Sequence, residues 1–274
     1  MGASKSYNKN VLKSTPVISN TPWLRIRRPS KSHLRLFCLP HAGGGASTYR
    51  GWQADFSPSI QVCPVQPPGR EERIREPSYL DMHTLVMSLT DALAGFTDKP
   101  FVFFGHSMGA AVAFEVAHEL RRRRLPQPAH LLLSAFSAPQ CPRRRGPLAQ
   151  LPDADFVAEL KQMGGSPREV LDNQEVMELL LPTLRADFQL IEQYRYQESA
   201  LLDCGMTVFG GREDDDAPFE DLEAWQLHTT GIFRVQTFSG GHFYLMERGD
   251  ELRAAISNDL RHLADQREFP DRPP

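Results

Sequence analysis

The pentapeptide Gly105-His106-Ser107-Met108-Gly109 decides the fold of this chain, because it reads G-x-S-x-G directly after the apolar run of residues 101–104. Residues 110–120 follow with good helix formers and with apolar side chains at helical spacing. The sequence therefore predicts a buried strand, a sharp turn and a helix. Glycines on both sides of Ser107 remove side chains that would collide at such a turn, so the serine hydroxyl is left exposed above the sheet.

A strand, turn and helix of this kind form the nucleophile elbow of α/β-hydrolases, in which the catalytic residues follow in the order Ser, Asp or Glu, His. A serine hydroxyl needs a histidine to take its proton and a carboxylate to orient that histidine. His242 lies in a Gly-Gly-His-Phe segment after the strand-like residues 232–238. Among the histidines beside a glycine motif or the serine, it alone comes last in the chain. We therefore predict Ser107 as nucleophile and His242 as base.

The acid is predicted in the run Glu213, Asp214, Asp215 and Asp216, which follows a strand-like segment at residues 206–211. A charge run is more often a solvated loop, and three consecutive aspartates leave the choice among them open. We favour Asp214, the first of the three after the Gly-Gly turn. The other usual place for the acid, after the predicted strand at residues 131–135, holds no Asp or Glu from residue 136 to residue 150.

A glycine-rich loop at residues 40–45 follows the predicted first central strand at residues 34–39. Glycines let backbone N–H groups approach a developing oxyanion without obstruction. We expect the two donors of an oxyanion hole to be the N–H groups of Ala42 and of Met108, the residue after the nucleophile. A phosphate-binding loop is the alternative, but the pattern G-x-x-x-x-G-K-[ST] is absent.

Five segments together resemble one family, the type II thioesterases of polyketide and nonribosomal peptide assembly lines. They are residues 37–47, 65–74 (containing Pro-Gly-Arg), 103–110, 137–139 and 240–245, and the similarity extends over roughly residues 34–260. The medium-chain thioesterase II of animal fatty acid synthase is a related branch. The resemblance implies hydrolysis of acyl thioesters from the phosphopantetheine arm of acyl or peptidyl carrier proteins. No metal-ligand cluster or cofactor-binding loop stands out in the sequence, and the expected chemistry needs neither. The resemblance places nucleophile, acid and base on Ser107, Asp214 and His242, and the oxyanion donors on Ala42 and Met108. The aspartate triplet and the N-terminal extension depart from the family pattern.

Length and composition agree with one enzyme domain in 274 residues, of which 41% are hydrophobic. A net charge of −3 argues against a general nucleic-acid binder. Alternating strand and helix patterns predict a mostly parallel central sheet with helices on both faces. Four cysteines without metal or redox spacing, and the lack of an apolar span or signal peptide, favour a reducing compartment, so we expect a cytoplasmic protein with no membrane partner.

The chain is divided by composition into a flexible N-terminal tail at residues 1–29 and a single domain at residues 30–274. Within that domain, an insertion at about residues 140–200 is predicted to be a helical lid, with helices at 153–163 and 174–197 and a hinge at Gly164-Gly165. Its apolar side chains could line an acyl channel or simply pack on the core; they include Met163, Leu180, Leu184, Phe188 and Leu190.

Two basic segments are candidate docking sites for a carrier protein, because carrier proteins are generally acidic. The arginines at 121–124 end a helix, where cations complement its dipole, so those at 143–145 are the better docking candidates. Arg70 and Arg73 are as well explained by structural salt bridges as by substrate contact. A carboxylesterase or an acyltransferase of the same fold remains an alternative function, as does a non-catalytic carrier-protein-binding scaffold, although the latter would not be expected to retain Ser107, His242 and the glycines.

Overall fold

The computed structural model describes residues 21–26 and 32–265, and at its centre lies a six-stranded parallel sheet in the order β2-β1-β3-β4-β5-β6. The strands are β1 (Leu34–Leu39), β2 (Ile60–Pro64), β3 (Phe101–His106), β4 (His130–Ser134), β5 (Gly205–Gly211) and β6 (Phe233–Phe238). The chain moves outward from β1 to β2 and then crosses back to β3 on the other side of β1. A reversal of this kind opens a crevice beyond the carboxyl ends of β1 and β3, and open α/β sheets bind their ligands in such a crevice.

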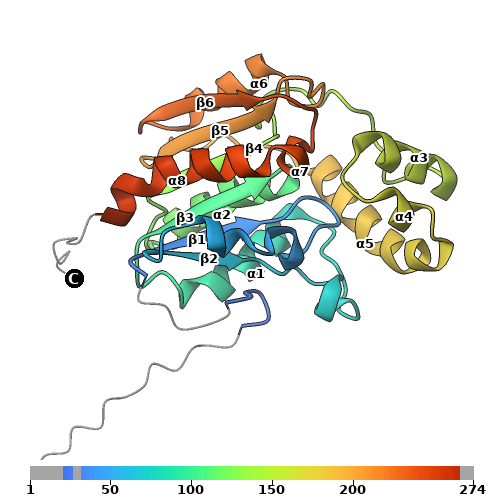
Figure 1. Ribbon diagram of the computed structural model, residues 1–274, viewed down its shortest axis with the longest axis horizontal. Coiled ribbons are helices and arrows are strands. Elements are labelled where there is room, and N and C mark those ends of the chain that lie inside the picture. Colours follow the sequence, from blue (N-terminus) through green and yellow to red (C-terminus); the bar gives the residue numbers. More distant parts are fainter. Residues whose placement is uncertain (1–20, 27–31, 266–274) are drawn as a thin grey trace, which may run out of the picture.

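Helices cover both faces of the sheet (Figure 1). Helices α1 (Met82–Ala94) and α2 (Met108–Arg122) pack on one face, and α8 (Gly249–Asp265) packs on the other. Strand β3 shows why its sequence is apolar throughout: Phe101 and Phe103 lie in the core with α1 and α2, whereas Val102 and Phe104 lie in the core with α8. The predicted α/β architecture is therefore confirmed.

Three helices are inserted between β4 and β5 and lie beyond one end of the sheet (Figure 1). They are α3 (Asp153–Met163), α4 (Arg168–Leu171) and α5 (Gln174–Gln193), and we call them the inserted helices. Helix α3 has the predicted bounds. Helix α5 ends four residues before the predicted end, because the backbone leaves the helical conformation at Tyr194. The inserted helices share a small apolar core of their own that includes Phe156 and Phe188.

Short elements complete the chain between the larger ones. Helix α6 (Phe219–Glu223) follows β5, and α7 (Tyr244–Glu247) follows β6. Single 3₁₀ turns lie at Ala46–Tyr49, Trp52–Asp55, Glu71–Arg73 and Ala224–His228. No helix in the described ranges is both long and apolar enough to cross a membrane.

Part of the segment expected to be a flexible tail is packed on the sheet edge. Trp23 and Leu24 are buried, and Leu24 forms an antiparallel bridge with Val65 just beyond β2. The Arg73 guanidinium lies over the Trp23 ring, 4.8 Å from its centroid. For residues 21–26 the expectation was therefore wrong, because two large apolar side chains find a site on the domain. Residues 1–20 and 27–29 of the predicted tail lie outside the described residues.

Candidate active site

Ser107 stands on a strained turn between β3 and α2. Its backbone has φ 53° and ψ −120°, a conformation that L-residues rarely adopt and that is concentrated at functional sites. The flanking glycines are required by close packing: a Cβ on Gly109 would lie 2.2 Å from the Leu39 carbonyl oxygen, and a Cβ on Gly105 would lie 2.1 Å from that of Gly109. The turn therefore has the elbow geometry predicted from the pentapeptide.

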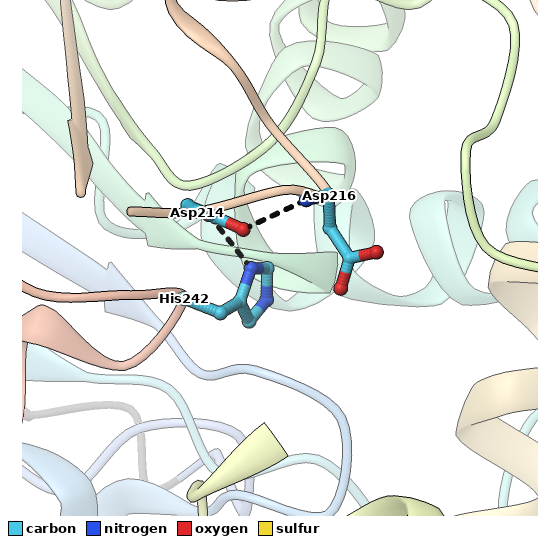
Figure 2. Close-up of side chains that lie close together, drawn as sticks. All are labelled: Asp214, Asp216 and His242. Carbon is cyan, nitrogen blue, oxygen red and sulfur yellow. Dashed lines mark hydrogen bonds and ion pairs between the residues drawn. The ribbon is translucent and has the colours of Figure 1, made fainter. Parts of the chain in front are cut away.

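The structure brings the three predicted triad residues into one hydrogen-bonded chain. His242 Nε2 lies 2.9 Å from the Ser107 hydroxyl oxygen, and His242 Nδ1 lies 2.9 Å from Asp214 Oδ2. Figure 2 shows the imidazole pointing toward Asp214, which lies in the loop after β5. The Asp214 side chain is 1% exposed, so its carboxylate interacts with His242 in a weakly screened environment. This arrangement can take a proton from Ser107 and stabilise the imidazolium that results.

The three consecutive aspartates are distinguished by their surroundings. Asp214 is buried and also accepts a hydrogen bond at Oδ1 from the backbone N–H of Asp216 (3.0 Å; Figure 2). Asp215 is exposed, and the Asp216 carboxylate forms an ion pair with Arg145. Only Asp214 among the three is hydrogen-bonded to the His242 ring, so the geometry favours it as the acid.

Two further histidines border the site, and sequence reasoning assigned neither a role. Burial, with smaller contributions from His242 and Arg70, lowers the pKa of His41 to about 4, and burial lowers the pKa of His106 well below its ordinary value. Both rings are therefore neutral at physiological pH. His106 Nδ1 bonds the Ser134 hydroxyl (2.8 Å), which in turn bonds the Tyr244 hydroxyl (2.7 Å). The position of His106 inside the pentapeptide was the available signal, but the Tyr244 contact joins segments 110 residues apart.

A cavity of about 470 Å³ opens over Ser107 and His242. Ala42 and Met108, the expected oxyanion residues, both line it beside the serine. Met108 is the first residue of α2, and the first N–H groups of a helix have no partner within the helix. The remaining wall comes largely from the inserted helices and the loop before them. Of the residues expected in an acyl channel, Met163, Leu184 and Phe188 line the cavity, whereas Leu180 and Leu190 are not among its lining residues and belong to apolar cores.

The predicted docking arginines also border this cavity, but two of them are already paired. Arg144 forms an ion pair with Asp221, and Arg145 pairs with Asp216 and Glu159. Arg143 donates to the backbone carbonyl of Ile191. Arg143 is therefore the best candidate for contact with a carrier protein, because the charges of Arg144 and Arg145 are already balanced by carboxylates of this protein.

A cation could in principle be held by Asp214, Asp216 and His242, whose ligand atoms lie within 4.8 Å of one another. Each of these groups already has a partner in the protein: Asp214 and His242 bond each other, and Asp216 is paired with Arg145. The chemistry available to the serine, histidine and aspartate requires no metal.

The parallel sheet, the elbow and the helices inserted after β4 define the chain as an α/β-hydrolase. Comparison with known proteins narrows this class. The model of a family described as "Thioesterase domain" matches residues 34–260, so the chain belongs to the thioesterase family and is an enzyme of that family.

The relatives of this chain cover most of its length. Thioesterase PikA5 of Streptomyces venezuelae is 37% identical over 251 residues, which are 91% of this chain and 88% of the relative. The solved structure of the type II thioesterase BorB, from the borrelidin biosynthetic cluster, matches this chain with a TM-score of 0.80 and 37% identity. The match covers 87% of this chain and 98% of the BorB chain. A Brevibacillus parabrevis protein named linear gramicidin dehydrogenase LgrE is 40% identical over 248 residues, 89% of this chain and 94% of the relative. Its name differs from the others, but the family model and the site geometry agree with a thioesterase.

Proposed function

We propose that this protein is an editing type II thioesterase, which hydrolyses acyl thioesters from the phosphopantetheine arm of carrier proteins in a polyketide or nonribosomal peptide synthase. The observation that carries the proposal is the hydrogen-bonded chain from Asp214 through His242 to Ser107 at the wall of a cavity. The names of its relatives, among them a type II thioesterase of a biosynthetic cluster, support the substrate class.

In the first half-reaction, Ser107 Oγ attacks the thioester carbonyl carbon while its proton moves to His242 Nε2. The carbonyl oxygen becomes an oxyanion, and the N–H groups of Ala42 and Met108 are the proposed donors to it. The tetrahedral intermediate collapses, the carbon–sulfur bond breaks, and the phosphopantetheine thiol leaves with the proton that His242 returns. Asp214 keeps the imidazole in the required tautomer and stabilises its charged form.

Water completes the cycle on the acyl-enzyme. His242 removes a proton from a water molecule, whose oxygen attacks the acyl carbonyl carbon. The second tetrahedral intermediate then releases the carboxylic acid, and the proton on His242 returns to Ser107 Oγ.

We further propose that the inserted helices act as a lid over this site, since Leu160, Met163, Leu184 and Phe188 border the same cavity as Ser107. The four cysteines are free, and three of them are buried, which fits a protein of a reducing compartment such as the cytoplasm. An acidic carrier protein is the proposed partner, with Arg143, an exposed residue that lines the cavity, as a contact.

The proposal is tested by hydrolysis of an acyl-phosphopantetheinyl carrier protein beside the matching oxygen ester, with the natural protein and with Ser107→Ala. We expect thioester hydrolysis that the substitution abolishes. A preference for the oxygen ester would make the protein a carboxylesterase, and transfer of the acyl group to an added alcohol or amine in place of water would make it an acyltransferase. Carrier-protein binding without turnover would indicate a scaffold.

A further inference from the structure

A buried carboxylate on α5 is bonded to the loop that carries the proposed oxyanion donor Ala42. Asp187 Oδ2 accepts a hydrogen bond from the backbone N–H of Gly43, at 2.7 Å. Asp187 is 3% exposed and lies 144 residues from Gly43 in sequence. Gly43 is the residue directly after Ala42, so this bond fixes the peptide unit next to the one expected to contact the oxyanion.

The same carboxylate is held from the other side by Arg70, in the Pro-Gly-Arg segment. The Arg70 guanidinium bonds both Asp187 oxygens, at 2.5 Å and 2.9 Å, and both side chains are about 95% buried. Arg70 also donates to the carbonyl of Gly44 at 3.1 Å and to that of Pro68 at 3.0 Å. The pair therefore contacts the loop twice, once at the N–H of Gly43 and once at the carbonyl of Gly44.

Direct packing ties α5 to the same loop. A Cβ built on Gly43, where φ is +77°, would lie 2.4 Å from Leu184 Cδ2, so the helix touches the loop backbone at the glycine. One turn of α5 away from Asp187, Thr183 donates to the carbonyl of Gly69. The middle of α5 is consequently fixed to the loops after β1 and β2.

A buried ion pair is weak support for stability alone, since apolar replacements of similar volume are often neutral or stabilising. The pair of Asp187 and Arg70, however, also bonds two peptide groups next to the proposed oxyanion donor, so it can fix the orientation of that donor. If the loop turned by a few tens of degrees, the Ala42 N–H would no longer point at the position of the oxyanion, and such donors act only when held in place beforehand.

On the basis of the proposed function, we infer that Asp187 and Arg70 are positioning residues for thioester hydrolysis: they hold the Gly43 and Gly44 peptides so that the Ala42 N–H faces the oxyanion. Neither residue is among those lining the cavity over Ser107, so both act through the loop. Helix α5 thereby serves two purposes, as a wall of the acyl cavity through Leu184 and as the support of the oxyanion loop through Asp187.

The first variant is Asp187→Asn. Among the described residues, the hydrogen-bond partners of Asp187 are all donors, namely the Gly43 N–H and two N–H groups of Arg70, and an amide would turn its NH₂ toward at least one of them. We expect kcat for octanoyl-N-acetylcysteamine to fall about 10²-fold with KM changed by no more than about threefold, because a displaced oxyanion donor acts on the transition state. The matched control is Asp153→Asn, which alters an exposed ion pair of the inserted helices with Arg185 and should leave both constants unchanged.

Binding of octyl boronic acid distinguishes a positioning role of Asp187 from a purely structural one. The boronic acid forms a tetrahedral adduct on the serine oxygen, whose boronate oxygen takes the place of the oxyanion, whereas the uncharged 1-octanol offers no anionic oxygen and reports on the acyl cavity. In Asp187→Asn, affinity for the boronic acid should fall by about the same factor as kcat, with affinity for 1-octanol retained.

Asp187→Asn leaves a buried guanidinium without a full partner and can fail to fold, so the double variant Arg70→Met/Asp187→Leu provides a second test. It fills the space with apolar groups and removes the acceptor for the Gly43 N–H. A folded double variant with kcat within about threefold of the natural protein would overturn the inference, as would equal losses for octyl boronic acid and 1-octanol. If the natural protein hydrolyses no thioester at all, the proposed function fails instead, and the boronic acid comparison still tests the loop.

Discussion

Substitution of Asp214 by asparagine changes one atom of the hydrogen-bonded chain, and the structure specifies which way the new amide must turn. Asp214 Oδ1 accepts from the backbone N–H of Asp216 at 3.0 Å, and Oδ2 faces His242 Nδ1 at 2.9 Å. An amide oxygen is needed at the first position, because an NH₂ group there would oppose the backbone N–H. The amide nitrogen therefore takes the second position and donates to His242 Nδ1.

This orientation reverses the tautomer of His242. With Nδ1 accepting a hydrogen bond, the ring proton moves to Nε2, which lies 2.9 Å from Ser107 Oγ and can then no longer accept the hydroxyl proton. The corresponding substitution in a serine–histidine–aspartate site lowers kcat about 10⁴-fold, which corresponds to about 5 kcal/mol of transition-state stabilisation.

The assay is release of free thiol from octanoyl-N-acetylcysteamine, with Ser107→Ala defining the background and thermal unfolding confirming that the variants fold. Asp215→Asn and Asp216→Asn are the matched controls, and each should retain activity within about tenfold, because neither carboxylate bonds His242. Asp214 is not the catalytic acid if Asp214→Asn keeps more than about a tenth of the natural activity, or if Asp216→Asn is the inactive variant.

Three further outcomes are expected. A Cβ on Gly165 would lie 2.2 Å from the Phe243 ring, beside His242, so Gly165→Ala should lower kcat. A Cβ on Gly146 meets no atom of the described residues within 4 Å, so Gly146→Ala should not lower kcat, and equal activities of the two variants would contradict the close contact. Because the folded pKa of His41 is about 4 against 6.5, the unfolded chain binds the extra proton, and denaturant titrations should show up to about 3 kcal/mol of stability lost as pH falls from 6.5 to 4, with a shallower loss in His41→Gln. Arg143→Glu should raise KM for an acidic carrier-bound substrate about tenfold at low salt but not for a small thioester; equal effects on both substrates would remove the docking hypothesis.

Local chemistry explains why the elbow and its surroundings were predictable from the sequence. The turn at Ser107 depends on side chains within two residues of it, and the strands and helices around it depend on periodicities of a few residues. Chain order and a glycine-rich loop predict His242 as the base. The packing of Trp23 was not predictable in this way, because the residues around it form no periodic apolar pattern and the groups that it and Leu24 contact lie in the segment after β2.

The class of fold, and the predictions of Ser107 as nucleophile, of His242 as base and of an acidic loop, all follow from contiguous motifs of the sequence, because the steric demands of such motifs are short-ranged. The tertiary structure distinguishes Asp214, which the sequence favours without excluding its two neighbours, by its hydrogen bond to His242, and it makes Asp187, 117 residues away, the partner of Arg70. It also decided that Arg144 and Arg145 are neutralised at the cavity. These results depend on which loops the sheet brings together, and ion pairs and hydrogen bonds act only over a few ångströms once that has happened.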